Sequence, residues 1–425
     1  MKVVVAHPHQ QHSYRLASAI KKAGHELVYV TTVYNKPFSL TKIVESLLSG
    51  DDRKKAQSRR CDYLKDSEVK QFCELGGLIV LLLFRLDRKK RLYNFVYSFV
   101  RKKFGIKAAR FAHKINADVF IGYDICSLES FEWLSVHDES ISRVVDYSAV
   151  PLPCQARYAF ADLSLEGNAA TRQCEDALDP ILQNYAYGVK ELLLLDYALA
   201  ASDFTKEALC SCGVRKERVF RASYGFPQLE KTERRKSSER GEPVVFAYCG
   251  RLTHAKGVHR LLNAFKLMER GSCRLILVGD YDNSDGRFDD YLDSCTFTGP
   301  LIRSEALRQV AQADVFVFPS LTDGMSLSCM EAMALGLPII VTRSTGASQF
   351  VVEGVNGFTV DAGDEGEMAR LMTFFVKNPD LIDEMGKASL EIAQSVSWSD
   401  YDSSIAAFAS LVESDRAKLG NDNER

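Results

Sequence analysis

The chain has 11 cysteines but no C-x-x-C pair, and its closest two, Cys210 and Cys212, are separated by a single residue. A zinc knuckle and a thioredoxin-like redox site are therefore not indicated. The longest apolar run, 75–84, has ten residues, whereas a membrane-spanning helix needs about twenty. No G-x-G-x-x-G fingerprint occurs, which weakens the case for a nicotinamide-dependent enzyme.

Strong charge of one sign is also lacking. The net charge is −2, with 46% apolar and 26% charged residues, a balance typical of globular proteins and not of general nucleic-acid binders. No secretory signal opens the chain, because Met1–Val5 runs directly into His7-Pro8-His9. Free thiols in this number suit a reducing compartment. We therefore expect a cytoplasmic protein, or one bound peripherally to the cytosolic face of a membrane, that does not bind nucleic acid.

Short β-branched runs alternate with segments of helical periodicity, as in parallel βαβ units. The expected strands are 2–6, 27–32, 119–122, 143–145 and 193–197, then 244–248, 274–278, 315–318 and 338–341. The expected helices include 14–23, 258–268, 305–311, 328–334 and 398–413, and a further helix begins at Ser202 or Asp203. A length of 425 residues fits two α/β domains.

The strongly charged stretch 230–241 separates the two series of strands and cannot bury apolar area. We therefore expect an N-terminal Rossmann-like domain at 1–228, a linker at 229–243 and a second Rossmann-like domain at 244–395. The remainder, 396–425, is expected to be a helix that packs back on the first domain, followed by a loose tail.

Two cations share a loop after the strand that begins the second domain. Gly250 ends the strand and lets the backbone approach a ligand, and Arg251 and Lys256 follow before the next helix. Such a pair suits a diphosphate. The alternative is that both are solvated surface cations.

A second loop follows the strand 315–318. Asp323 and Gly324 lie on it, and Ser326 opens a helix whose free N–H groups can hold a phosphate or a sugar. Glu331 follows in the first turns of this helix, where its carboxylate can accept hydrogen bonds from ribose hydroxyls. Alternatively, Asp323 shapes a turn and Glu331 compensates the helix dipole.

These two loops resemble the motifs of retaining GT-B glycosyltransferases of family 4, also called group 1 glycosyl transferases. Asp323 and Glu331 are separated by seven residues, as in the family's E-x7-E signature, and Gly250-Arg251 with Lys256-Gly257 resembles its G-R-x4-K-G loop. Further segments fall in the family order: Ser202–Thr205, Tyr224–Pro227, Val278–Asp280, Phe297–Pro300, Ala313–Val315 and Asn356–Phe358.

The resemblance implies an α/β GT-B fold, with two Rossmann-like domains facing each other across a deep cleft. It also implies a role for each matching residue. Arg251 and Lys256 would bind the donor diphosphate, and Glu331 would hold the ribose. The base pocket would be lined by Gly299, Pro300 and Leu301. Asp323 would bind the transferred sugar, helped by backbone groups of Gly324, Met325, Ser326 and Leu327. Neither a metal nor another cofactor is required, because fixed cations already face the diphosphate.

Two departures from the family pattern bear on chemistry. Asp323 stands where the family usually has Glu, which leaves the donor sugar open. The first domain has His7–His12 where a glycine pair is common. The candidate residues on the acceptor side are His9, Gln11, His12, Tyr123, Asp124 and Asp146. A tyrosine at a strand end is more often a core residue, and the departing diphosphate can itself take the acceptor proton.

Asp280-Tyr281-Asp282 reads as D-x-D, the metal site of a different glycosyltransferase fold. It directly follows the strand 274–278, where the family has a plain strand-end loop. We therefore favour the loop interpretation.

The stretch 85–114 is basic and aromatic, with eleven cations against the single acid Asp87. It suits either an anionic membrane surface or a core helix with a cationic solvated face. The first alternative favours a lipid-linked glycan acceptor in the biosynthesis of a surface polysaccharide, such as lipopolysaccharide or capsule. Other functions remain open: a non-catalytic nucleotide-sugar-binding or scaffold protein, and a soluble synthase of the sucrose or glucan type.

Overall fold

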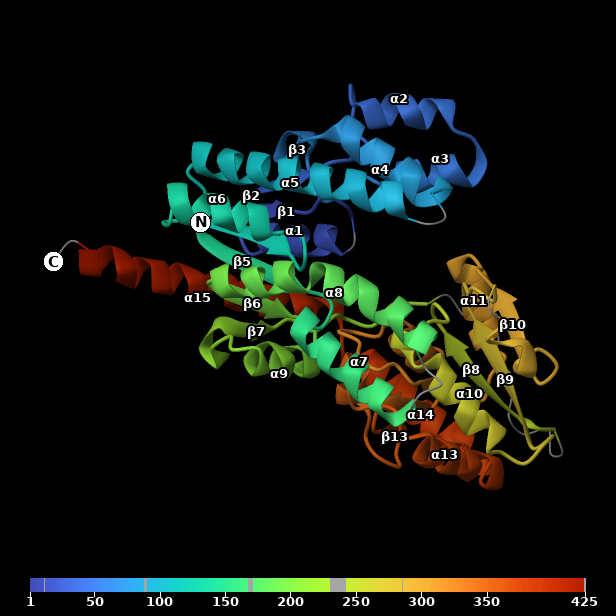
Figure 1. Ribbon diagram of the computed structural model, residues 1–425. Coiled ribbons are helices and arrows are strands. Elements are labelled where there is room, and N and C mark those ends of the chain that lie inside the picture. The colour runs from blue at the N-terminus through green and yellow to red at the C-terminus, as the bar shows by residue number, and fades with distance from the viewer. Residues whose placement is uncertain (11, 88–89, 167–170, 230–241, 285, 424–425) are drawn as a thin grey trace.

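The computed structural model describes residues 1–10, 12–87, 90–166, 171–229, 242–284 and 286–423. The first half of the chain contains a parallel sheet in the order β3-β2-β1-β4-β5-β6-β7 (Figure 1). Its strands are β1 Lys2–Ala6, β2 Glu26–Thr31, β3 Val69–Gln71, β4 Val119–Tyr123, β5 Ser142–Tyr147, β6 Tyr197–Ala200 and β7 Val219–Arg221.

The second half contains another parallel sheet, in the order β10-β9-β8-β11-β12-β13. Its strands are β8 Val244–Cys249, β9 Cys273–Val278, β10 Cys295–Gly299, β11 Val315–Phe318, β12 Ile339–Thr342 and β13 Gly357–Val360. In both sheets the strand order reverses beside the first strand, between β1 and β4 and between β8 and β11. The expectation of two Rossmann-like halves is confirmed, and each half has a switch point where ligands of such folds bind.

Helices connect the strands in both halves. Those of the first half are α1 Ser13–Lys22, α2 Leu40–Leu47, α3 Gly50–Gln57, α4 Glu74–Leu86, α5 Arg91–Lys114, α6 Leu128–His137, α7 Leu152–Glu166, α8 Thr171–Leu194 and α9 Asp203–Ser211. Those after β8 are α10 Val258–Lys266, α11 Arg303–Val310, α12 Leu327–Ala334, α13 Glu365–Lys377, α14 Asp380–Ser395 and α15 Trp398–Asn423. Among the helices described, none is long and apolar enough to cross a membrane.

Most expected elements lie within a residue or two of their observed positions, but the strand expected at 193–197 was wrong. Leu193 and Leu194 end α8, and β6 begins only at Tyr197. A short apolar run looks the same in a buried strand and in a packed helix, so periodicity does not separate them. The expected start of α9 is confirmed, since the Ser202 hydroxyl accepts the Thr205 N–H at 3.1 Å.

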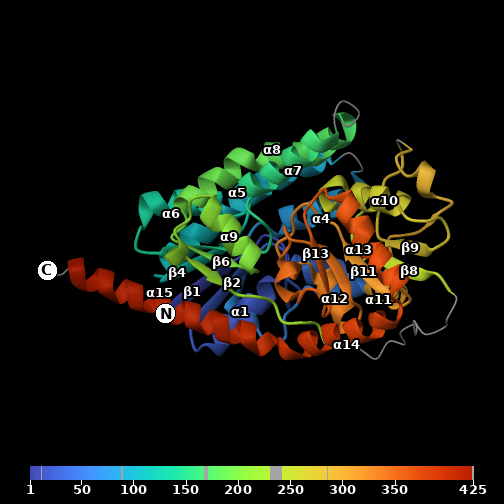
Figure 2. The same cartoon turned by 90° about the horizontal axis from the view of Figure 1, so that it is seen from below.

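The last helix joins the two halves. α15 follows α14 of the second half and then packs against α1 (Figure 2). Lys22 of α1 pairs with Asp402 at 2.7 Å, and the Tyr197 hydroxyl donates to Asp415 at 2.9 Å. The N-terminal amino group lies 3.5 Å from Glu413. Residues 230–241 of the expected linker lie outside the described residues.

Candidate functional site

The two loops singled out in the second half lie side by side at its switch point. β8 and β11 are neighbouring parallel strands, so the loops after their carboxyl ends meet at one edge of the sheet. The Leu321 N–H donates to the Ala255 carbonyl at 3.1 Å. Gly257 has a φ of +65°, and a Cβ there would lie 1.9 Å from the Pro319 carbonyl oxygen. A side chain at 257 would therefore push the two loops apart.

This packing brings two of the proposed catalytic residues into contact. The Lys256 ammonium forms an ion pair with the Asp323 carboxylate, and the two side chains are 34% and 14% exposed. Arg251, on the same loop as Lys256, is exposed and makes no ion pair within the described part of the chain. The site therefore presents one compensated and one uncompensated cation. Gly250 supports the loop, since a Cβ at its φ of +154° would lie 2.7 Å from the Tyr248 hydroxyl.

Glu331 lies in α12, directly after the Asp323 loop. Its carboxylate accepts a hydrogen bond from the Arg303 guanidinium at 2.7 Å, and it is 18% exposed. Arg303 opens α11, two residues after Leu301. The turn of Gly299, Pro300 and Leu301 therefore lies at the same edge of the sheet as Glu331. Arg303 is a partner that reasoning from the sequence did not find.

The start of α12 faces the first half of the protein. A Cβ on Gly324 would lie 2.1 Å from the carbonyl oxygen of Ser148, which follows β5. The Gly324 carbonyl also accepts a hydrogen bond from Thr205 at 3.3 Å. Ser326 is 2% exposed, and its hydroxyl has no hydrogen-bond partner among the described residues. Met325 is buried and Leu327 is exposed.

In the first half, several acceptor-side candidates converge at the other switch point. The His12 Nε2 lies 2.9 Å from the Asp146 carboxylate. Asp124 follows β4, the neighbour of β5. Burial, reinforced by the nearby charge of Asp146 and opposed by His12, raises the pKa of Asp124 to about 6.

The remaining candidates of this group are placed differently. Tyr123 is 0% exposed and packs edge-on against the His12 ring, so it is a core residue. His9 stacks on Tyr97 of α5 at 5.2 Å. Burial, with the charge of Arg59, lowers the pKa of His9 to about 4, so this imidazole is neutral at pH 7. Gln11 lies outside the described residues.

A cavity of about 800 Å³ lies between the halves, next to these groups. Its lining includes His12, Arg15, Ser148, Tyr224, Met325, Leu327 and Trp398. Tyr224 stacks on Trp398, whose ring also packs under the Arg15 guanidinium at 4.5 Å. Arg15, Ser148 and Trp398 are not among the site residues that the sequence predicts. Tyr224 belongs to one of the segments that carry the resemblance, and Trp398 opens α15 between Ser397 and Ser399.

Asp280 and Asp282 of the D-x-D sequence lie on the loop after β9. The Asp280 carbonyl accepts the Leu252 N–H at 2.9 Å, and the Asp282 carboxylate accepts the Ser284 N–H at 2.9 Å. Among the described residues, neither joins a cluster of potential metal ligands. The geometry is that of a strand-end loop.

The family model of "Glycosyl transferases group 1" matches residues 230–391, which hold both loops of the second half. The capsular polysaccharide biosynthesis glycosyltransferase CapM of Staphylococcus aureus is 28% identical over 175 residues, covering 39% of this chain and 46% of that protein. The chain spans between about a third and a half of the length of the curated relatives it matches.

Solved structures match almost the whole chain. Sucrose-phosphate synthase from Thermosynechococcus elongatus superimposes with a TM-score of 0.62 and 16% identity, covering 97% of this chain and 99% of that one. Anabaena Alr3699/HepE in complex with UDP gives a TM-score of 0.58 and 16% identity, covering 97% and 100%. The fold is therefore the GT-B arrangement expected from the sequence.

Proposed function

We propose that the protein is a hexosyltransferase that moves a sugar from a nucleoside-diphosphate donor to a hydroxyl of a glycan acceptor, with retention at the anomeric carbon. The observation that carries the proposal is the contact between Lys256 and Asp323 at the switch point of the second half, with Arg251 exposed on the same loop. Two cations suit the departing diphosphate, whose negative charge develops as the sugar–phosphate bond breaks. The match of residues 230–391 to group 1 glycosyl transferases supports this assignment.

The donor would lie along the switch point of the second half, with its sugar toward the cavity that Met325 and Leu327 line. Its diphosphate would contact Arg251 and Lys256, its ribose Glu331, and its base the turn at Gly299–Leu301. The sugar would then lie near Asp323 and the start of α12. Gly324 touches the first half at Ser148, so this position also faces the acceptor side. No group in this arrangement requires a metal or another cofactor.

Burial and pairing leave fewer candidates for the side chain that contacts the acceptor hydroxyl. Asp146 is 3% exposed and paired with His12, which lines the cavity. Of the acceptor-side candidates that the structure describes, His12 is therefore the one best placed to touch an acceptor hydroxyl. Asp146 would orient its ring, and the departing diphosphate remains the alternative proton acceptor.

A thermal-shift screen of nucleotide sugars tests the donor assignment. A ligand present at a hundred times its dissociation constant adds about 2.7 kcal/mol to the stability of the folded state. A shift with one nucleoside-diphosphate sugar, together with release of the nucleoside diphosphate in the presence of an acceptor extract, supports the proposal. A shift without release favours a non-catalytic binding protein, and the absence of any shift contradicts both. Transfer to a small soluble sugar favours a synthase of the sucrose or glucan type.

We further propose that the acceptor is lipid-linked and that the protein binds an anionic membrane through the first half, in the assembly of a surface polysaccharide. Large apolar side chains are exposed over α2, α4 and α5. Helix α4 contacts both α2 and α5. The exposed side chains are Leu40, Ile43, Leu47, Leu75, Ile79, Leu82, Phe84, Leu86, Leu92, Phe95 and Phe99. Exposed apolar residues gathered in this way mark interaction surfaces.

The two interpretations of the stretch 85–114 each fit a different part of it. Toward its C-terminal end α5 is a core helix, with Phe104 and Ala108 buried, whereas Phe95 and Phe99 near its start are exposed. The exposed cations of α5 are Arg91, Lys102, Lys103, Lys107, Arg110 and Lys114. Arg101 is not among them, because it donates to the Ile125 carbonyl and lies 3.9 Å from the Tyr187 ring centroid. Arg88 and Lys89 lie outside the described residues.

A further inference from the structure

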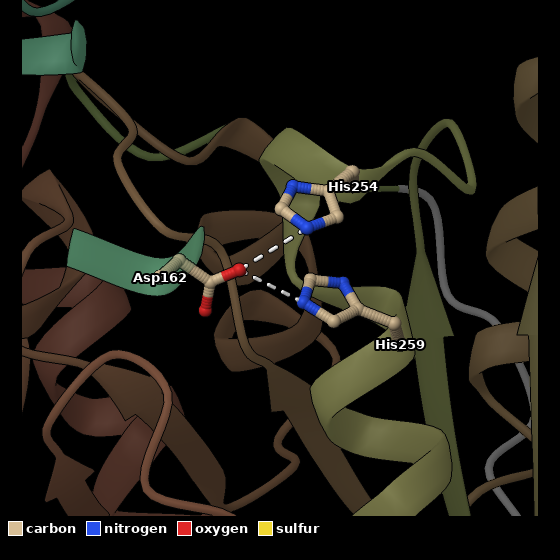
Figure 3. A group of neighbouring side chains, drawn as sticks. All are labelled: Asp162, His254 and His259. Carbon is tan, nitrogen blue, oxygen red and sulfur yellow. Dashed lines mark hydrogen bonds and ion pairs between the residues drawn. The ribbon is translucent and has the colours of Figure 1, made fainter. Parts of the chain in front are cut away.

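Three side chains that take no part in the proposed reaction converge where the two halves meet (Figure 3). Asp162 lies in α7 of the first half. His254 lies in the short 3-10 helix His254–Lys256 of the second half, and His259 lies in the first turn of α10. The Nε2 atoms of His254 and His259 are 3.2 Å and 3.0 Å from the same oxygen, Oδ2 of Asp162.

The cluster is shielded from solvent, and a neighbouring arginine holds its carboxylate in place. Asp162 and His254 are 2% and 4% exposed, and His259 is 17% exposed. The Arg260 guanidinium donates to Oδ1 of Asp162 at 2.8 Å and to its carbonyl oxygen at 3.0 Å, and also pairs with Glu365 at 2.8 Å. Arg260 thus fixes the carboxylate through Oδ1, and both imidazoles approach the other oxygen.

We propose that Asp162, His254 and His259 form a binding site for a divalent transition-metal ion of the Zn²⁺ class, which ties α7 to the donor loop. Two imidazoles and one carboxylate are a ligand set that Zn²⁺ accepts, with the fourth position open to water. Ligands at about 2.0–2.1 Å from a tetrahedral ion lie roughly 3.3 Å apart. The two Nε2–Oδ2 separations, 3.0 and 3.2 Å, are close to that value. The two imidazole rings stack at 4.0 Å and 9°, so they must turn toward each other for both Nε2 lone pairs to point at the ion.

Two surrounding features support the site. Metal-bound carboxylates are themselves held by outer hydrogen bonds, as Arg260 holds Oδ1 of Asp162. Glu365 balances the charge of Arg260 on its other side, which lessens its repulsion of an incoming cation. A cavity of about 460 Å³ reaches both imidazoles and provides a path for the ion and room for a water ligand.

The proposal goes beyond the proposed function, because the ion would not touch the substrates. His254 and Lys256 belong to one helical turn, while Asp162 belongs to the other half of the protein. A bound ion would therefore hold the donor loop against α7 and stabilise the junction between the halves. Loss of the ion would lower the stability of the folded protein, whatever reaction the protein catalyses.

The test uses the full chain after dialysis against a chelator. Zn²⁺ is titrated in competition with a chromophoric chelator, and Co²⁺ is added separately to record its visible spectrum. We expect one equivalent of tight binding, a cobalt spectrum of a nitrogen and oxygen site, and a rise in melting temperature with Zn²⁺. His259→Ala and Asp162→Asn should each weaken binding at least tenfold and remove the rise in melting temperature.

His113→Ala is the matched control, because His113 also pairs with one aspartate, Asp138, but is remote from the cluster in the fold. It should bind the ion as the parent protein does. Absence of stoichiometric binding would overturn the proposal and leave a plain hydrogen-bonded cluster. So would equal binding by the His259→Ala variant, or a thiolate charge-transfer band with Co²⁺, which would assign the ion to cysteines. If the variants do not fold, the cobalt spectrum of the parent protein decides alone.

Discussion

The ammonium of Lys256 pairs with the carboxylate of Asp323, 67 residues further along the chain. The pair forms because parallel strands β8 and β11 are neighbours and place their loops at one edge of the sheet. Before a donor arrives, the cation is already held in position by a carboxylate. A phosphate that binds there shares this cation with Asp323, which couples the two residues we assign to the diphosphate and to the sugar.

The first prediction concerns the two loop cations. Arg251→Ala and Lys256→Ala should each lower kcat/KM by about two to three orders of magnitude, because each removes a charge that stabilises the departing diphosphate. Lys256→Ala should also lower the melting temperature, since it leaves Asp323 without its partner, whereas the exposed Arg251 is dispensable for folding. Lys387→Ala, an exposed cation of α14, is the control. Near-normal turnover in both loop variants would remove the diphosphate assignment.

Glu331 is expected to act on donor binding more than on chemistry. Glu331→Gln keeps the shape of the side chain but weakens its hydrogen bonds to ribose, so the donor KM should rise while kcat falls less. Arg303→Ala is the matched control. Arg303 is 64% exposed, and such ion pairs contribute at most about 1 kcal/mol, so its donor KM should change by less than about fivefold. A fall in kcat at unchanged donor KM in Glu331→Gln would place this residue at the reacting centre.

Asp323→Asn should show the opposite pattern. The sugar changes charge and shape as it reacts, so a carboxylate that contacts it contributes mainly in the transition state. Steady-state kinetics should give a large fall in kcat at nearly unchanged donor KM. The variant also loses the ion pair with Lys256, so its melting temperature must be measured alongside. A donor KM that rises while kcat stays normal would move Asp323 from the sugar to the diphosphate.

Membrane binding should depend on both charge and exposed apolar area. Each Lys or Arg near an anionic surface contributes about 1 kcal/mol, screened within about 10 Å at 0.1 M salt. Co-sedimentation with anionic vesicles should fall with added salt, with Lys102 and Lys103 changed to Gln, and with Phe95 and Phe99 changed to Ser. Changing Lys377 and Lys387 of the second half to Gln is the control. If the parent protein does not co-sediment with such vesicles at low salt, the membrane proposal is wrong.

Glu191 gives a prediction on pH dependence. Its carboxyl group accepts the N–H groups of Ile125 and Ser127, and burial raises its pKa to about 8. Between pH 5 and 8 the folded protein then binds a proton that the unfolded chain releases. Stability should therefore fall as pH rises, by up to about 1.4 kcal/mol per pH unit from this group.

Glu191→Gln removes the titration and leaves one N–H poorly paired. It should be less stable than the parent protein at pH 5, and urea unfolding should show this gap narrowing toward pH 8. Glu207→Gln, on the exposed face of α9, should follow the parent curve. A gap that does not change with pH would contradict the raised pKa.

The sequence was enough to predict both sheets and most of the strands because β-branched runs and strand-end glycines are local signals. It also placed Gly250, Lys256 and Asp323 on loops at strand ends, where the structure has them. It did not predict the contacts that reach this region from other elements. Arg303 reaches Glu331 from another helix, and Asp162 meets His254 from the other half of the protein. Such contacts depend on how separate elements pack, which no local pattern records.

The strand expected at 193–197 failed for a related reason. Four consecutive leucines, Leu192 to Leu195, satisfy a buried strand and the end of a packed helix equally well. Only the length of α8 and its packing on α7 separate the two. Arg101 illustrates the same limit for charge, because its neighbours Lys102 and Lys103 are exposed while its own guanidinium turns inward.

The position of α15 also bears on biosynthesis. The ribosome delivers α1 and β1 early, but the helix that covers α1 emerges only after the whole second half has been made. The contacts that α15 makes with Met1, Lys22 and Tyr197 can therefore form only after the second half has been synthesised. During translation of the second half, the apolar side chains that α15 later covers, such as Tyr197 and Phe220 against Phe408, are therefore still exposed.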